Sequence, residues 1–145
     1  MAATSTRKIT ANTTPASSSH CSGACGSGRH SIYLLQRGHA VTSSDIDVTA
    51  LTDLQEESNL EIVTADLENA PWPFSDRQFA AVIVTNYLYR PLFPVILSAL
   101  APGGLLLYET FAAGNERFGR PRNPAHLLKR GELISGILAG LTILA

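Results

Sequence analysis

The sequence predicts an α/β fold built on a mainly parallel sheet, and three observations support this class. From residue 23 onward, short apolar runs alternate with helix-like segments, the pattern of repeated strand and helix units. Polar residues follow most of the apolar runs, where the carboxyl ends of parallel strands would meet. The chain has 145 residues and 45% hydrophobic side chains, which allows one domain with a buried core.

Each element of this fold has its own local signal. The apolar run 79–85 is continuous, which suits a strand covered on both faces. Gly38 ends the first helix, and the Pro-Trp-Pro segment 71–73 requires a loop. The Pro-Gly-Gly segment 102–104 ends the predicted helix 94–100 ahead of the next strand, and 140–145 offers the start of one further strand. The predicted strands are 40–44, 60–64, 79–85 and 105–108, and the predicted helices are 29–37, 49–58 and 94–100.

The first 22 residues differ from the rest of the chain. They contain ten Ser or Thr residues and no Asp or Glu. Such a segment buries too little apolar surface to offset its ordering entropy, so 1–22 is predicted to be disordered and 23–145 to form the domain. A Ser-rich start without acids is also typical of an organelle transit peptide, so a cytoplasmic location is expected with an organelle as the alternative.

Composition limits the classes of partner. The net charge of −1 gives no electrostatic case for nucleic acid or an anionic membrane surface. The longest apolar tract without a charge or proline, 133–145, is too short to cross a bilayer. His20, Cys21, Cys25 and His30 match no common zinc spacing, so no metal is expected. The oligomeric state stays open.

Glycines and acids after the predicted strands define a candidate site. Gly26 and Gly28 let a ligand approach the backbone closely. Asp45 comes 19 residues after Gly26, a spacing that suits a bidentate contact to a ribose diol. Asp66, after the next strand, can accept a hydrogen bond from an adenine amino group. The third position of a dinucleotide fingerprint holds Ser31 instead of glycine, which favours S-adenosylmethionine over NAD.

Two other interpretations stay open at this point. A single aspartate at either position is better explained as a solvated helix cap, and only the pair at this spacing favours a nucleoside site. An NAD-binding oxidoreductase with a Rossmann-like sheet also remains an alternative, because the spacing of the glycine loop and the acid fits both cofactors.

Longer stretches resemble a known family. These stretches are ACGSGRHSIYLLQRGHAVTSSDID, TADLENAPWPF, AAVIVTNYLYRPL and LAPGGLLLYETFAAGNERFGRPRNP. Together they resemble class I S-adenosylmethionine-dependent methyltransferases, in particular the small bacterial type related to tellurite-resistance methyltransferases. The resemblance runs from about Gly26 to Glu132. It implies a Rossmann-like, mainly parallel sheet, S-adenosylmethionine as cofactor, and methyl transfer to a small acceptor.

The resemblance also implies roles for individual residues, without singling out a catalytic one. Gly26 and Gly28 would lie under the methionine and ribose, and Asp45 would hold the ribose hydroxyls. Asp66 and Leu67 would hold the adenine. The methyl-donor face would be lined by Asn86, Tyr87 and Leu88, and the substrate-side candidates are Tyr87, Arg90, Glu109 and Arg117.

The chain departs from the family pattern at both ends. Ser22 stands where the family has an acid, and the residues before the glycine loop lack the apolar character of a first strand. The chain also stops where the family continues into two closing strands. The sheet is therefore expected to be incomplete at both termini, as a partial methyltransferase domain. A truncated, non-catalytic remnant that binds the cofactor poorly is the alternative.

Overall fold

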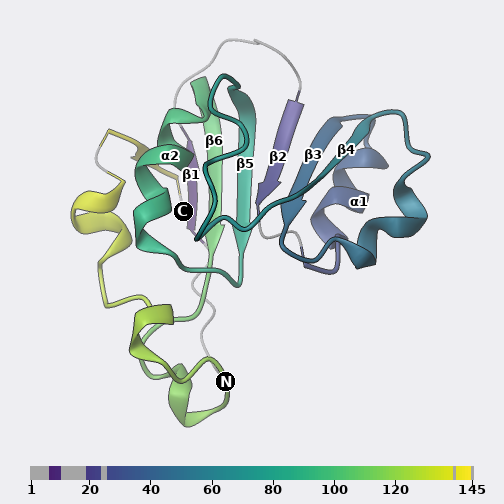
Figure 1. Cartoon of the computed structure of the whole chain (residues 1–145). Helices are drawn as coiled ribbons and strands as arrows, with labels where there is room; N and C mark the ends of the chain where they lie inside the picture. Colours follow the sequence, from purple (N-terminus) through teal and green to yellow (C-terminus); the bar gives the residue numbers. More distant parts are fainter. Residues whose placement is uncertain (1–6, 11–18, 24–25, 139, 145) are drawn as a thin grey trace.

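The computed structural model describes residues 7–10, 19–23, 26–138 and 140–144. Within these residues the strands form one sheet in the order β4-β3-β2-β5-β6-β1-β7 (Figure 1). The strands are β1 (Arg7–Thr10), β2 (Ser19–Gly23), β3 (Ala40–Asp45), β4 (Leu60–Thr64), β5 (Phe79–Thr85), β6 (Leu100–Glu109) and β7 (Thr142–Ile143). The helices are α1 (Arg29–Leu35) and α2 (Phe93–Ser98). Shorter helical segments are η1 (Thr49–Leu54), η2 (Arg90–Leu92), η3 (Asn115–Arg117), η4 (Pro124–His126) and the π-helical η5 (Leu133–Ile137).

Five neighbouring strands of the sheet, from β4 to β6, are parallel. The register pairs Asp45 with Thr64 and Thr85 with Glu109, so these strands end at one edge of the sheet. Helix α1 packs against β3 and helix α2 against β6. The predicted Rossmann-like α/β fold is confirmed, and the predicted bounds of 60–64 and 79–85 agree with β4 and β5.

The predicted disorder of residues 1–22 is wrong where the structure describes them. Strand β1 pairs antiparallel with β6 along Arg7–Thr10, and with β7 at Ile9 and Thr10. Strand β2 begins at Ser19. Residues 1–6 and 11–18 lie outside the described residues. The composition did not predict these strands because strand pairing uses the backbone N–H and C=O groups, which a polar segment offers as well as an apolar one.

Strand β2 forms although the residues before the glycine loop lack the apolar character of a first strand. It pairs in parallel with β3 from Ser19 to Gly23 and with β5 from His20 to Gly23. The Cys21 side chain is fully buried in the core cluster with Phe79 and Val82. The neighbouring strands therefore keep their hydrogen-bonded partner at the centre of the sheet, although β2 contributes little apolar surface.

Strand β6 starts earlier than predicted, because 102–104 forms an irregularity within the strand and not a turn before it. Leu100 pairs with Phe79, and the register then shifts so that Leu105 pairs with Ala81. A Cβ on Gly104 would lie 2.8 Å from the Ala101 carbonyl oxygen, so only glycine fits this close approach. The predicted final strand is confirmed as the short β7.

Candidate functional site

A cavity of about 570 Å³ opens where the order of the strands reverses. Strands β3 and β4 lie to one side of β2, whereas β5 and β6 lie to the other. Such a switch point at the carboxyl ends is where ligands bind open parallel sheets. Loops after four neighbouring strands line it: Gly26, Ser27, Arg29 and His30 after β2, Asp45 and Ile46 after β3, 65–69 after β4, and 85–87 at the end of β5.

Asp45 ties the glycine loop to the end of β3. Its Oδ2 accepts a hydrogen bond from the Gly26 N–H at 2.9 Å, and its Oδ1 accepts one from the Asp47 N–H at 3.3 Å. A carboxylate has about four lone-pair sites, so further acceptor capacity remains. Gly26 has a φ of 50°, and a Cβ there would meet nothing within 4 Å. The backbone at Gly26 therefore faces open space, which a ligand can enter.

Gly28 is not among the residues that line this cavity. It has a φ of 73° immediately before α1, and a Cβ there would lie 2.3 Å from Cδ2 of the buried Leu51. Glycine is required at this position by backbone conformation and by helix packing. The structure thus brings Gly26, but not Gly28, to the cavity.

Asp66 caps the turn that follows β4. Its Oδ1 accepts hydrogen bonds from the backbone N–H groups of Glu68 at 3.0 Å and Asn69 at 3.1 Å. Its Oδ2 accepts one from the Asn69 side chain at 3.0 Å. These bonds, the Asn69 side chain first, hold the pKa of Asp66 below its usual value. Asp66 thus caps a turn that no helix follows, and the turn holds Asp66 and Leu67 in the lining of the cavity.

The end of β5 bends Tyr87 into the cavity wall. Asn86 has a left-handed φ of 56°, and its N–H donates to the Glu109 carbonyl at 2.8 Å. The Tyr87 carbonyl accepts a 2.8 Å hydrogen bond from the buried Tyr108 hydroxyl. The Tyr87 hydroxyl oxygen is shielded from solvent and has no hydrogen-bond partner among the described residues. Burial first and the Glu68 carboxylate second raise the pKa of this phenol, so it stays protonated at neutral pH.

Sequence reasoning gave no role at the site to Arg29, His30 and Glu68, which line the cavity, although Glu68 belongs to the polar group after the predicted strand 60–64. The Arg29 Nε donates to His30 Nε2 at 3.1 Å. Burial and then the Arg29 charge lower the pKa of His30, against an opposing effect of Glu109. The signal that could have found the first two is their place in the first turn of the helix after the glycine loop.

Three of the four substrate-side candidates do not line the cavity. Arg90 forms a bidentate ion pair with Glu132, with Nε–Oε1 at 2.5 Å and Nη2–Oε2 at 3.0 Å. Its other hydrogen bonds go to the carbonyls of Ala125 and Leu127, so it is a structural clamp. Glu109 ends β6, and Arg117 is exposed in η3. Tyr87 alone of the four candidates lies in the cavity wall.

The charges of the lining are unbalanced. Three carboxylates, those of Asp45, Asp66 and Glu68, stand against the single guanidinium of Arg29. The lining therefore favours a cationic ligand over an anionic one. In the part of the chain that the structure describes, no group of three or more His, Cys, Asp or Glu side chains could hold a metal ion.

A family whose description is "Methyltransferase domain" matches residues 22–104, which is more than half of the chain. The chain belongs to this methyltransferase-domain family. The matched range contains all of the residues that line the cavity. No curated protein matches the chain.

Solved structures of methyltransferases share the fold of this methyltransferase domain. The glycopeptide N-methyltransferase MtfA complexed with (S)-adenosyl-L-methionine is 21% identical, with a TM-score of 0.54, over 72% of this chain and 52% of that one. A TehB-like SAM-dependent methyltransferase from Corynebacterium glutamicum is 24% identical, with a TM-score of 0.50, over 63% and 53%. A putative methyltransferase from Thermoplasma acidophilum is 21% identical, with a TM-score of 0.51, over 62% and 42%. The chain spans about half the length of MtfA, and the likeness establishes the class I methyltransferase fold.

Proposed function

We propose that this chain binds S-adenosylmethionine in the cavity at the switch point and transfers its methyl group to a small-molecule acceptor. One observation carries the proposal: Gly26, Asp45, Asp66 and Tyr87, from four separate loops, line one cavity in a methyltransferase domain. The finer assignment, to the small bacterial type related to tellurite resistance, rests on the resemblance of TNYLYRPL and ETFAAGNERFGRPRNP.

The lining fits this cofactor in size and in chemistry. A volume of about 570 Å³ is within the range of roughly 300–1,000 Å³ that small-molecule sites occupy. The unused lone pairs of Asp45 would accept the ribose hydroxyls beside the open backbone of Gly26. The rigid turn at Asp66 and Leu67 would hold the adenine. Asn86 and Tyr87 would lie along the methyl-donor side.

Charge supports S-adenosylmethionine over NAD. A sulfonium and an ammonium group both gain from a lining with three carboxylates and one guanidinium. A pyrophosphate would meet the same carboxylates as like charges, and the lining contains no lysine to offset them.

The chemistry makes modest demands on the side chains. When bound, the cofactor supplies a methyl group on a sulfonium: a lone pair of the acceptor forms the new bond to carbon, and the carbon–sulfur electron pair stays on sulfur. The chain's residues need only hold donor and acceptor in line, since correct orientation can lower the activation barrier by about 7–11 kcal/mol. The Tyr87 hydroxyl stays protonated and is shielded from solvent, so it cannot act as a base near pH 7.

The remaining expectations about partners and location form part of the proposal. We expect a cytoplasmic protein with a small-molecule acceptor and without a nucleic-acid or membrane partner. Among the described residues, no helix has the length and apolar character needed to cross a membrane.

The test is calorimetric titration of the full chain with S-adenosylhomocysteine and, separately, with NAD. The proposal predicts saturable binding of S-adenosylhomocysteine and at least ~10-fold weaker binding of NAD. Preferential binding of NAD would support the oxidoreductase alternative. A folded chain that binds neither ligand would support the non-catalytic remnant.

A further inference from the structure

A second cavity, of about 360 Å³, lies beyond the carboxyl end of β6 and outside the part of the chain that the family matches. It begins at Thr110, the residue after the end of β6. Its apolar lining includes Leu128, Leu133 and Ile134, and its charged lining comprises Lys129, Arg130 and Glu132. None of these residues lines the proposed cofactor cavity.

The two cavities lie at the ends of neighbouring strands, β5 and β6. Thr85, which lines the first cavity, pairs with Glu109 in the sheet. Asn86 of the first cavity donates its N–H to the Glu109 carbonyl at 2.8 Å, and Thr110 of the second cavity follows directly. The lining of the second cavity thus begins one residue beyond the strand end to which Asn86 is bonded.

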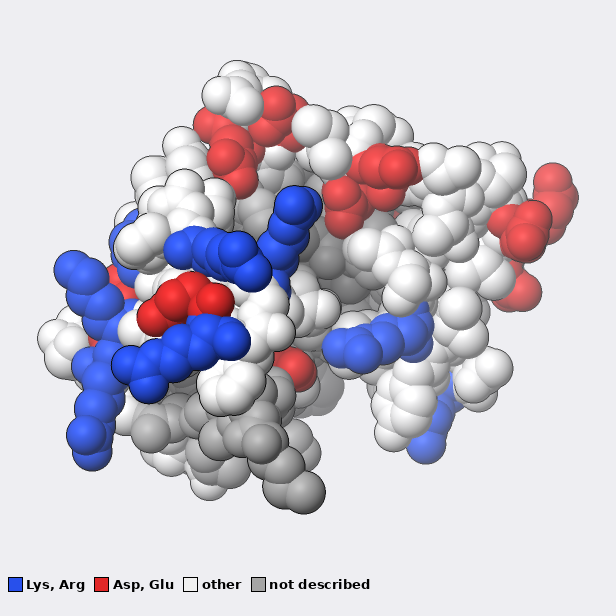
Figure 2. Space-filling model, turned by 90° about the horizontal axis from the view of Figure 1, so that it is seen from below, with Lys and Arg blue, Asp and Glu red and all other residues white. Residues whose placement is uncertain are grey.

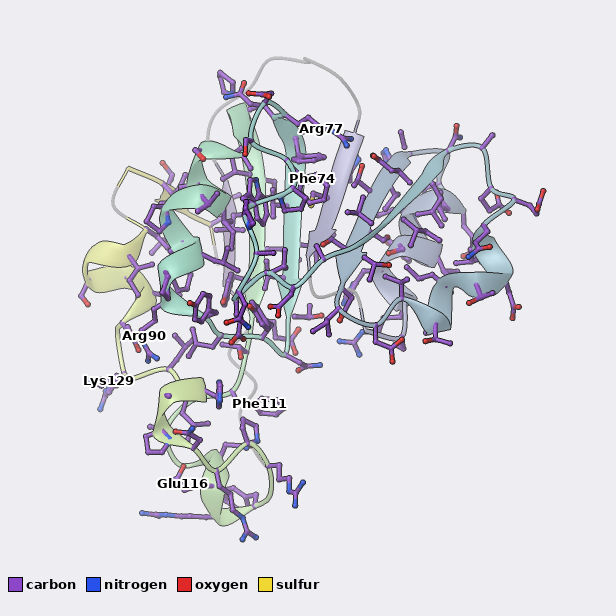
Figure 3. All side chains as sticks on the ribbon, in the orientation of Figure 1. Phe74, Arg77, Arg90, Phe111, Glu116 and Lys129 are labelled. Atoms are coloured by element: carbon purple, nitrogen blue, oxygen red, sulfur yellow. The ribbon has the colours of Figure 1, made fainter. Side chains whose placement is uncertain are left out.

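Backbone bonds and one ion pair give the second cavity a fixed frame. Residues 111–128 form a lobe below the sheet, at the end of β6 (Figure 1). The lobe closes through the Leu128 N–H to the Phe111 carbonyl and the Ala113 N–H to the Leu128 carbonyl, both at 2.9 Å. Beyond the lobe, Arg90 holds Glu132, which also accepts the Lys129 N–H at 2.7 Å. Figure 3 shows Lys129 extending from this segment, near Arg90.

The ion pair decides the charge of the second cavity. Arg90 engages both carboxylate oxygens of Glu132 and holds the pKa of Glu132 below its usual value. The positive charges of the exposed Lys129 and Arg130 are thereby left in excess. Within the described residues, neither cation lies within salt-bridge distance of a carboxylate.

The surroundings of the cavity reinforce this charge. Three arginines on the lobe, Arg117, Arg120 and Arg122, are exposed, against the single exposed carboxylate of Glu116. Seen from below, Figure 2 shows Lys and Arg side chains gathered on the side where the lobe projects. The cofactor cavity is acidic and its neighbour is basic, so the two cavities select ligands of opposite charge.

From this arrangement we infer that the second cavity binds the anionic group of the methyl acceptor, a small organic acid with an apolar body. The carboxylate or phosphate would lie against Lys129 and Arg130, and the apolar body against Leu133 and Ile134. Ile134 is 47% exposed, so an apolar ligand would remove a large hydrophobic side chain from water. The assignment of this ligand as the acceptor rests on the proposed methyl transfer, whereas its binding does not.

The test titrates the full chain with phenylacetate and phenyl phosphate as anionic probes, and with phenylacetamide as a neutral probe of similar shape. Backbone NMR shifts locate the bound probe. The inference predicts shifts at Thr110 and at 129–134, and at least ~10-fold weaker binding of the amide. Phenylacetate and phenyl phosphate together distinguish a carboxylate from a phosphate ligand. The anion affinity should fall with rising salt concentration.

Variants separate this cavity from the basic lobe. Lys129→Ala with Arg130→Ala should weaken anion binding ~10-fold or more, because both charge-assisted contacts to the anion are lost. Both side chains are exposed, so their removal should leave the fold intact. The matched control, Arg117→Ala with Arg120→Ala, removes the same charge from the lobe, but these exposed side chains do not line the cavity. Their long-range effect is screened by salt, so at 0.15 M salt the affinity should fall less than ~3-fold. Equal losses in both variants, equal binding of the amide, or absence of anion binding in a chain that still binds S-adenosylhomocysteine would each overturn the inference. Anion binding without S-adenosylhomocysteine binding would instead overturn the proposed function and, with it, the role of the anion as acceptor.

Discussion

Replacement of Asp45 by alanine tests the proposed ribose contact most sharply. The carboxylate already orients the glycine loop through the 2.9 Å bond to the Gly26 N–H, and its remaining lone pairs face the cavity. A hydrogen bond to a charged group contributes about 1.5–3 kcal/mol, so loss of two ribose contacts should cost at least ~3 kcal/mol. This corresponds to a fall of roughly 100-fold or more in affinity for S-adenosylhomocysteine.

The assay is calorimetric titration at a temperature well below the melting point of each variant. Asp45→Ala also removes the acceptor for the Gly26 and Asp47 N–H groups, so we expect a destabilisation of about 1–2 kcal/mol. Asp47→Ala is the matched control, because this exposed carboxylate contacts Thr49 and does not line the cavity. An affinity of Asp45→Ala within ~2-fold of the original chain would show that Asp45 does not hold the ribose.

Three further predictions concern the frame of the site. Gly28→Ala should destabilise the chain by about 2–4 kcal/mol in thermal melts, because its Cβ would lie 2.3 Å from Leu51. Gly38→Ala is the control: Gly38 has a similar φ but open space around it, so this change should cost only about 1 kcal/mol. Arg90→Met should lower the free energy of unfolding by about 1–3 kcal/mol in urea titrations, since it breaks a partly buried ion pair with Glu132; an unchanged urea midpoint would contradict the clamp. Because Arg90 depresses the pKa of Glu132 below its ordinary 4.5, this stabilisation is fully present above pH 4.5 and is lost as the pH falls through the lowered pKa. The urea midpoint should therefore fall less steeply between about pH 5 and about pH 3 in Arg90→Met than in the original chain.

The sequence predicts the strands whose signals are local. Alternating or continuous apolar runs identify β4 and β5 with correct bounds, because the apolar pattern of each strand lies within its own residues. Strands β1 and β2 could not be predicted in this way, since they form by pairing with strands that are distant in the sequence, β6 and β5 respectively. The Pro-Gly-Gly segment is similar, because only the register with Phe79 and Ala81 makes it part of β6.

The candidate site divides along the same line. The spacing of Gly26 and Asp45 predicts a shared ligand; both residues line one cavity, and a 2.9 Å hydrogen bond between them, which the spacing does not predict, joins them. Gly28 has the same sequence signal, but its requirement for glycine arises from Leu51. The sequence offers Arg90 as a substrate-side residue, because its carboxylate partner, Glu132, lies 42 residues further along the chain and gives no local signal. Whether a polar residue serves a ligand or the fold is therefore decided by tertiary contacts.

The cofactor site proposed for this chain is the acid-lined cavity at the switch point. Titration of the isotope-labelled chain with S-adenosylhomocysteine, followed by backbone NMR, shows whether the cofactor binds there. We expect large, saturable shifts at the amides of Gly26, Asp45, Leu67 and Asn86, which line the cavity, and little change at Arg117 and Phe118 in the lobe. Saturable binding with shifts confined to other parts of the chain, or no shift at millimolar ligand, would contradict this proposal.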